Sequence, residues 1–269
     1  MITTTRRALI RVLLIALVTG AGIASGGAAW AAETEEDSGH PRDPWEGFNR
    51  GIFTFNDTLD FYLLKPVAKG YDKAMPDPLQ DGVSNFFNNI GEIKTIFNGL
   101  LQLKFKQAGL DTTRFLVNTT VGIFGFIDIG SRIGLEQHDE DFGQTLGYWG
   151  VGSGPYIVLP FLGPNTVRDS FGMIPDDYIS PYNAVDHDLT RYSIFAMEVV
   201  DLRAGLLDAE SLIAGDRYSF FRDAYLQRRD FLVNDGQMAD DFLEDDDLFD
   251  DFEDDEDFDE GEEAPEESL

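Results

Sequence analysis

The 269-residue chain carries a formal net charge of -30 and contains no cysteine. This charge argues against nucleic-acid binding, because phosphate groups would be repelled. The missing cysteine excludes disulfides, a thiol nucleophile and cysteine-ligated zinc.

Residues 1–31 have the features of a secretory signal peptide. Three arginines form a basic head, residues 12–18 are almost wholly aliphatic, and Ala-Trp-Ala at 29–31 fits the small-x-small pattern of a cleavage site. The apolar core is too short to cross a bilayer of about 30 Å. We therefore predict export from the cytoplasm and a mature N-terminus near Ala32. The arginine pair at positions 6 and 7 also resembles a twin-arginine signal, although the ordinary secretory route is favoured.

Residues 32–42 are polar and are predicted to form a disordered leader before a helical domain at 43–236. The domain opens on Asp43-Pro44-Trp45-Glu46, in which Asp43 is a candidate helix cap and Glu46 closes a capping box. The apolar residues that follow have the spacing of one broad helical face. Pro66 interrupts this pattern.

The middle of the domain predicts further amphipathic helices at about 77–87, at 93–101 and from Asp111 onward. Residues 121–134 are apolar and rich in glycine. In residues 142–164, glycine, proline and aromatic residues alternate too densely for a stable helix. This segment is predicted to be a short hairpin or a loop.

Two late helices are predicted, one from Phe195 to Ile213 and one from Tyr218 to Leu232. Because no run of alternating residues indicates long strands, the predicted class is mainly α with one small hairpin. The tail at 237–269 is strongly acidic and is predicted to be disordered. Aromatic residues make up 13% of the chain, with 22 phenylalanines. We expect part of them to contact lipid, since so much exposed apolar surface otherwise causes aggregation.

No catalytic, cofactor or metal site can be assembled from the sequence. His138 and His187 lie in acidic segments that could hold a cation, but capping and solvated surface are commoner roles for such segments. Ser153 has Val151 two positions before it, where the nucleophile elbow G-x-S-x-G needs glycine. Pro155 stands where a dinucleotide-binding loop needs glycine. We therefore predict that the protein is not an enzyme and holds no cofactor or metal.

Ten short motifs occur in order over roughly residues 43 to 235. They are DPWEGFNR (43–50), SNF (84–86), TRFLVNTT (113–120), GFID (125–128), FGQTLG (142–147), GVGSGPY (150–156), LP (159–160), RD (168–169), RAGLLD (203–208) and RDAYLQR (222–228). In this series the chain resembles the MlaA/VacJ family of outer-membrane lipid-asymmetry proteins.

The resemblance implies a multi-helix, ring-like domain embedded on the periplasmic side of the outer membrane. Such a protein lets phospholipids that have strayed into the outer leaflet pass through an amphipathic channel, without making or breaking a bond. The implied partners are phospholipid, a trimeric porin and a soluble periplasmic carrier that receives the lipid. Two alternatives remain open: a porin-associated structural protein that transports nothing, and a periplasmic phospholipase.

The sequence supplies candidates for the parts of such a channel. A helix lying in a leaflet needs a broad apolar face, for which the candidates are Phe48, Ile52, Phe55, Leu59 and Tyr62. A lining that passes headgroups needs polar positions, for which the candidates are Asn49, Arg50, Asn118 and Asp128. Helix capping and internal ion pairing are equally weighted alternatives for these four. The candidate hinges of a gating loop are Gly150, Gly152 and Gly154, with plain turn geometry as the alternative.

The chain departs from the family pattern in two places. Most members carry a lipobox cysteine that anchors them by a lipid, whereas we expect side chains to hold this protein to the membrane. The second departure is the acidic tail. It is either a solvated end or a flexible arm that recruits the positively charged face of the carrier.

Overall fold

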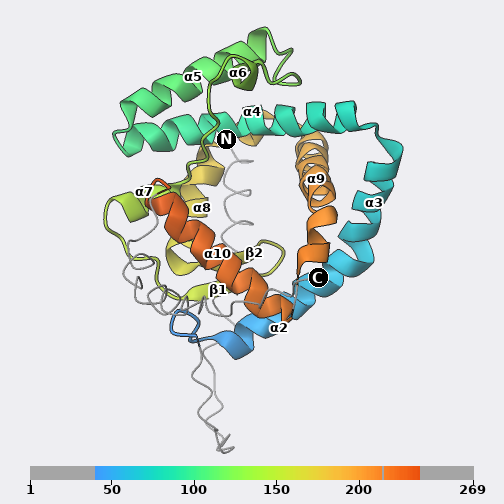
Figure 1. Ribbon diagram of the computed structural model, residues 1–269, viewed down its shortest axis with the longest axis vertical. Coiled ribbons are helices and arrows are strands. Elements are labelled where there is room, and N and C mark those ends of the chain that lie inside the picture. The colour runs from blue at the N-terminus through green and yellow to red at the C-terminus, as the bar shows by residue number, and fades with distance from the viewer. Residues whose placement is uncertain (1–39, 214, 237–269) are drawn as a thin grey trace, which may run out of the picture. The chain divides into compact units, whose positions relative to one another are not determined.

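The computed structural model describes residues 40–213 and 215–236. The predicted signal peptide, the acidic tail and residues 32–39 of the predicted leader lie outside these residues. The described chain is mainly helical with one two-stranded sheet, which confirms the predicted class (Figure 1). In chain order the elements are α2 (Glu46–Leu59), the π-helical turn η1 (Asp60–Leu64), α3 (Lys65–Ala74), α4 (Asp77–Leu101), α5 (Phe105–Thr120), α6 (Ile129–Arg132), α7 (Phe142–Tyr148), β1 (Tyr156–Leu159), β2 (Gly163–Thr166), α8 (Val167–Ile179), the 3-10 turn η2 (Pro181–Ala184), α9 (Asp188–Gly205), the 3-10 turn η3 (Asp208–Leu212) and α10 (Arg217–Val233).

The predicted capping box at the start of the domain is wrong. Helix α2 begins at Glu46, and the residue before it makes no side-chain cap. Asp43 is buried, and its carboxylate accepts hydrogen bonds from Asn49 Nδ2, at 2.8 Å, and from the Tyr218 hydroxyl. A buried carboxylate needs donors within the protein, so Asp43 joins α2 to α10 instead of capping a helix. Arg42, at the end of the predicted leader, pairs with Asp230 at 2.5 Å.

Pro66 does not end the first helix. The chain runs from α2 through η1 into α3, where Pro66 occupies the first turn. Proline lacks an N–H and its ring crowds the carbonyl four residues earlier. The wider π-helical turn at Asp60–Leu64 lies just before the proline and accommodates it.

The two helices predicted at 77–87 and 93–101 form one helix, α4. The apolar spacing fades between them because α4 buries polar side chains there, at Asn89, Glu92, Thr95 and Asn98. Helix α5 likewise begins at Phe105 and not at Asp111, which lies buried inside it. In both cases polar residues face the protein interior, where apolar residues were expected from the sequence.

The segment predicted as a hairpin or loop contains both a helix and a hairpin. Asp141 caps α7 by accepting a hydrogen bond from the Gln144 N–H at 2.8 Å. Strands β1 and β2 pair antiparallel, with Tyr156 opposite Thr166. Helix α8 follows directly and was not predicted. Its first turn is capped by Thr166, whose hydroxyl accepts from the Asp169 N–H.

The elements contact one another in a closed circuit. The α2 helix packs on β1 and leads through η1 into α3, which lies beside α9 (Figure 1). Helix α4 contacts α9, α5, α7 and α8, and α8 returns to β2 in the hairpin. Helix α10 lies against β2 and α7. The small apolar core at the hairpin end consists of Tyr156, Val158, Tyr218 and Leu226.

We predict that a methyl group at Gly172 destabilises the contact between α7 and α8. A Cβ at Gly172 would lie 2.5 Å from the backbone nitrogen of Gly143. Backbone cannot give way as a flexible side chain can, so Gly172→Ala should lower the free energy of unfolding by about 1–3 kcal/mol. The measurement is thermal unfolding of the detergent-purified chain, followed by circular dichroism.

Gly51→Ala is the matched control, because Gly51 lies in α2 and a Cβ added there would meet nothing within 4 Å. Alanine favours a helix over glycine, so this variant should be unchanged or more stable by up to about 1 kcal/mol. Equal unfolding temperatures for the two variants would contradict the close approach of α7 and α8.

Candidate functional site

The distribution of polarity is inverted relative to that of a water-soluble domain. Among the described residues, buried polar and charged side chains outnumber buried apolar ones by more than two to one. Several large apolar side chains are at least 70% exposed, namely Tyr62, Phe124, Phe161, Tyr178 and Leu189. Buried polar groups and large exposed apolar surfaces are the two informative exceptions to ordinary globular burial.

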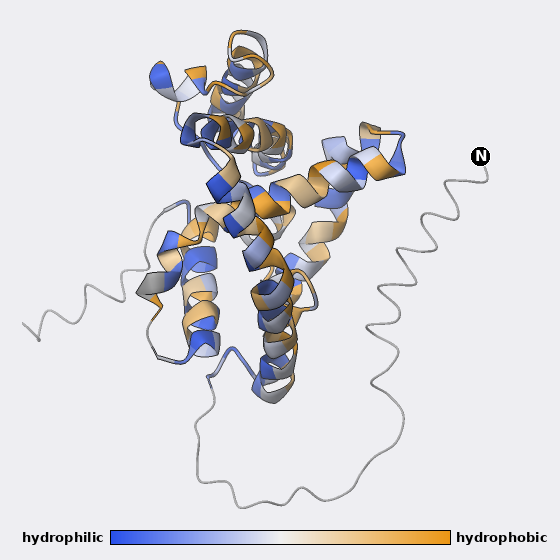
Figure 2. Cartoon of the chain, turned by 90° about the vertical axis from the view of Figure 1, so that its right-hand side faces the viewer, coloured by the Kyte–Doolittle hydropathy of each residue, from blue (hydrophilic) through white to orange (hydrophobic). Residues whose placement is uncertain are grey.

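The apolar surface is spread over many helices. Figure 2 shows hydrophobic and hydrophilic residues mixed along the described helices. Within residues 40–213 and 215–236, no helix combines the length and the hydropathy that a membrane span requires.

Asn49 holds the hairpin to α2. Its side-chain amide is fully buried and donates to Asp43 at 2.8 Å and to the Tyr156 carbonyl at 3.1 Å. Its side-chain oxygen accepts from the Val158 N–H at 2.9 Å. Both polar atoms of Asn49 are therefore used inside the protein.

Arg50 lies one residue further along α2, at the edge of the same region. Its guanidinium pairs with Glu46 at 2.7 Å and with Asp216 at 2.8 Å, and lies 4.3 Å from the centre of the Tyr218 ring. The side chain is 42% exposed. Arg50 thus connects α2 to the start of α10 while keeping part of its charge accessible.

Arg114 is the centre of a second polar cluster, between α4, α5 and α6. The guanidinium is buried and donates to Glu92 at 3.0 Å, to Asp128 at 2.7 Å and to the Leu135 carbonyl at 2.7 Å. It also donates to the Ser131 hydroxyl at 3.0 Å. One side chain therefore joins three helices.

Asn118 and Asp128 extend this cluster. Asn118 Nδ2 donates to Asp128 at 3.1 Å, and Asn118 Oδ1 accepts from the Gly130 N–H at 2.8 Å. Asp128 also caps α6 by accepting from the Ser131 N–H at 3.0 Å. The structure thus brings Asn118 and Asp128, two of the candidate lining residues, into contact. Their contacts are the helix cap and the internal pairing that were the alternatives to a lining role.

The cluster shifts the pKa of two carboxyl groups in opposite directions. Burial, reinforced by the charge of Asp111, raises the pKa of Glu92 from 4.5 to about 7, against the opposing effect of Arg114. Burial acts in the same direction on Asp128. There, hydrogen bonds from Ser131, Arg114 and Asn118 prevail and lower the pKa to about 2. Arg114 therefore has one fully ionised partner and one that titrates near neutral pH.

The predicted leaflet face is only partly exposed. Phe48 is 56% exposed, Phe55 46% and Tyr62 75%, and Leu59 is half-buried. Ile52 instead packs against the apolar core. The neighbouring side chains Phe61 and Leu63 add to the exposed part, at 60% and 58%.

The glycine segment at 150–154 lies between α7 and β1. Gly150 and Gly154 have φ values of +86° and +67°, which favour glycine. The carbonyl of Ser153 accepts from the Arg168 N–H at 3.1 Å, which ties the segment to the start of α8. A hinge at Gly150, Gly152 and Gly154 stays a prediction, as does the lining of a channel by Asn49, Arg50, Asn118 and Asp128.

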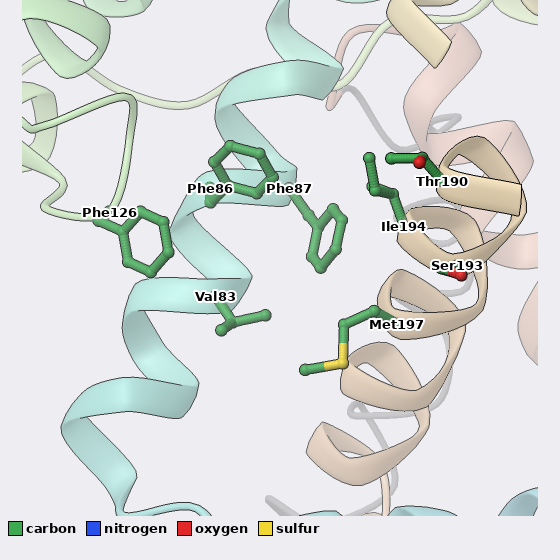
Figure 3. A pocket seen from close by; sticks show the side chains of 8 residues that line it. All are labelled: Val83, Phe86, Phe87, Phe126, Thr190, Ser193, Ile194 and Met197. Carbon is green, nitrogen blue, oxygen red and sulfur yellow. The ribbon is translucent and has the colours of Figure 1, made fainter. Parts of the chain in front are cut away.

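A pocket between α4 and α9 was not foreseen from the sequence. It has a volume of about 330 Å³ and is lined by Val83, Phe86, Phe87, Phe126, Thr190, Ser193, Ile194 and Met197 (Figure 3). The spacing of Val83, Phe86 and Phe87 could have indicated an apolar helix face, but that spacing is equally typical of ordinary core packing.

The histidine in the acidic segment before α7 has an internal role. His138 Nδ1 lies 2.7 Å from an oxygen of the buried Asp111. In the part of the chain that the structure describes, no group of three or more histidine, cysteine, aspartate or glutamate residues could hold a metal ion.

Comparisons with known proteins agree on one family. A family model described as MlaA lipoprotein matches residues 41–232. The intermembrane phospholipid transport system lipoprotein MlaA of Escherichia coli (strain K12) is 38% identical over 202 residues, which cover 73% of this chain and 80% of the relative. The protein of the same name from Haemophilus influenzae is 35% identical over 236 residues, covering 86% and 93%.

A solved structure shares the fold. It comes from work on the structural basis for maintenance of bacterial outer membrane lipid asymmetry, and it matches with a TM-score of 0.64 and 36% sequence identity. The match covers 71% of this chain and 99% of the solved one.

We predict that Glu92→Gln flattens the pH dependence of stability between about pH 4.5 and 7. The folded protein retains the Glu92 proton up to about pH 7, whereas the unfolded chain releases it near 4.5. The wild type therefore loses stability as pH rises through this window. Glutamine keeps an oxygen for Arg114 and has no proton to release, so the variant should gain on the order of 1 kcal/mol relative to wild type by pH 7.

Asp128→Asn is the contrasting control. Because the pKa of Asp128 is lowered to about 2 from 3.8, its contribution to stability is complete above 3.8 and is lost as pH falls through 2. This variant should be destabilised by about 2–3 kcal/mol at pH 7. Chemical unfolding of the detergent-purified proteins across pH measures both effects. Parallel curves for wild type and Glu92→Gln would show that Glu92 does not titrate in this window.

Proposed function

The chain belongs to the MlaA lipoprotein family, and from this premise we propose that it acts in intermembrane phospholipid transport and maintains outer-membrane lipid asymmetry. The observation that carries the proposal is the inverted polarity: polar clusters inside and large aromatic side chains outside. A phospholipid also combines polar and apolar parts. A protein that presents apolar surface to lipid tails and polar groups inside is suited to handle both.

We place the domain within one leaflet, on the periplasmic side of the outer membrane. The stretch from α2 to η1 supports this, because Phe61, Tyr62 and Leu63 are consecutive and more than half exposed. Lipid tails that cover such side chains contribute about 25 cal/mol per Å² of apolar surface removed from water. We propose that these side chains hold the protein to the membrane.

We propose that phospholipid passes along an amphipathic channel within the circuit of helices. Of the four candidate lining residues, Arg50 is best placed to meet a headgroup phosphate, because its guanidinium is partly exposed. Asn49 and Asn118 are buried and hold structural elements together. Gly150, Gly152 and Gly154 would allow the loop before the hairpin to open and close.

The transport cycle that we propose includes two protein partners, a trimeric porin that surrounds or supports the domain and a soluble periplasmic carrier that receives the lipid. The Escherichia coli relative is named as a transport system lipoprotein and not as an enzyme. The Ser153 hydroxyl contacts Arg42 at 3.5 Å and the Gly154 carbonyl at 3.4 Å.

Deletion of the gene in its own bacterium tests the transport proposal. Loss of the protein should raise the amount of phospholipid in the outer leaflet, measured by hydrolysis with a phospholipase added to intact cells. A plasmid copy should restore the original level, and a copy with Arg50→Ala should restore less of it. Unchanged lipid asymmetry in the deletion strain would favour the alternative of a protein that only braces a porin.

A second experiment tests the anchoring. Washing isolated membranes with high salt should leave the protein bound, because apolar contacts are not screened by ions. Combined replacement of Phe61, Tyr62 and Leu63 by aspartate should release much of it. Thr58→Asp, on an exposed position of α2, is the control and should stay bound. Release of the wild type by salt alone would indicate a peripheral protein.

A further inference from the structure

The pocket between α4 and α9 has the chemistry of a site for hydrocarbon. Side chains from the two helices point toward one another across it, and Phe126 approaches from the turn after α5 (Figure 3). Its volume of about 330 Å³ is at the lower end of the range of about 300–1,000 Å³ in which proteins hold small ligands. No lining residue carries a charge, and only the hydroxyls of Thr190 and Ser193 are polar.

The turn that carries Phe126 is strained. Ile123 and Phe124 adopt φ values of +55° and +58°, which cost of order 1–3 kcal/mol each in residues other than glycine. Such conformations persist where the surrounding structure fixes them. Here the amide of Gly125 donates to the Asn118 carbonyl at 2.8 Å, and Gly125 lies directly against the side chain of Asn89 on α4.

The result of this strain is the position of the Phe126 ring. The ring lies 5.6 Å from that of Phe86, and one of its carbons is 2.9 Å from the place where Gly82 would carry a Cβ. Gly82 is buried, so the absence of a side chain there is what lets the ring lie against α4. Phe126 itself remains 43% exposed, and it therefore forms a wall that a ligand can reach.

We propose that this pocket binds one fatty-acyl chain of a phospholipid, with Phe126 as one wall. The inference rests on the proposed function, because it assigns a position to the lipid that the protein handles. Each methylene removed from water contributes about 0.8 kcal/mol, whereas a charged headgroup would lose its hydration without a partner. The tail thus occupies the pocket and the headgroup stays outside it. The flexible Met197 can adapt to a tail of variable shape.

Photochemical labelling of the full chain tests the proposal. The probe is a phosphatidylcholine with a diazirine near the end of one acyl chain, added to the detergent-purified protein. After irradiation, mass spectrometry of peptides should locate adducts at 83–87, at Phe126 and at 190–197.

Ile194→Trp fills the pocket from α9. It should lower the labelling of 83–87 and Phe126 about tenfold, which corresponds to a loss of about 1.4 kcal/mol in binding. Leu189→Trp is the matched control, because Leu189 lies on the same helix, is 78% exposed and does not line the pocket. Its labelling should equal that of the wild type.

Gly82→Ala provides a second variant that does not fill the space. The new methyl would displace the Phe126 ring, so adducts on Phe126 should fall while those on 190–197 persist. If circular dichroism shows that Ile194→Trp does not fold, the loss of Phe126 adducts in Gly82→Ala tests the proposal in its place.

The outcomes separate this inference from the proposed function. Adducts confined to exposed side chains such as Tyr62 and Phe161 would overturn the pocket and leave lipid contact intact. Unchanged pocket labelling in a folded Ile194→Trp would also overturn it. Absence of adducts anywhere on the protein would overturn both proposals.

Discussion

A buried charge has to find its partner inside the protein, and in this chain that constraint determines how the helices meet. Arg114 ties α5 to α4 through Glu92 and to the cap of α6 through Asp128. At the other end, Arg229 on α10 pairs with Asp141 at 2.5 Å and with Asp169 at 2.8 Å, which joins α10 to α7 and α8. Removing Arg114 would leave the buried Glu92 without its arginine partner, whereas removing Arg229 would leave Asp169 with Arg168 alone, at 3.1 Å. Arg114 and Arg229 together thus connect six helices.

Apolar packing has a smaller role than in a water-soluble domain. For the leaflet-seated domain that we propose, lipid tails solvate the apolar exterior, so the hydrophobic effect does little to press the helices together. Close approach through small residues then becomes important. Gly143 meets Gly172 between α7 and α8. Between α4 and α5, a Cβ added at Gly99 would lie 3.5 Å from the Cβ of Ala108. Close contacts through small residues and hydrogen bonds between helices are the features expected of helices that pack in lipid.

The same inversion explains which parts of the fold could be predicted from the sequence. The helical class, the small hairpin and the final helix follow from spacing and from turn residues. The interruption placed between 87 and 93 was wrong because apolar spacing assumes an apolar interior, whereas Asn89 and Glu92 face inward on α4. The expectation of an apolar interior also explains why the sequence predicts a helix start at Asp111, which instead lies buried inside α5. Of the site, the sequence indicated Asn118 and Asp128 but not Arg114, since nothing in the sequence shows that its guanidinium lies between them and Glu92.

Helix α4 connects the polar cluster to the apolar pocket, because it contributes to both. Val83, Phe86 and Phe87 line the pocket toward α9, while Asn89 and Glu92 lie toward α5. The turn that positions Phe126 is held from the polar side: Asn89 donates to Thr119 at 2.9 Å, and Asp128, two residues after Phe126, is held by Arg114. Loss of the Arg114–Asp128 contact would therefore be expected to shift Phe126, which forms a wall of the pocket two residues before Asp128. The buried charges would be unfavourable inside the hydrocarbon site that we propose, and they lie on the opposite side of α4, toward α5.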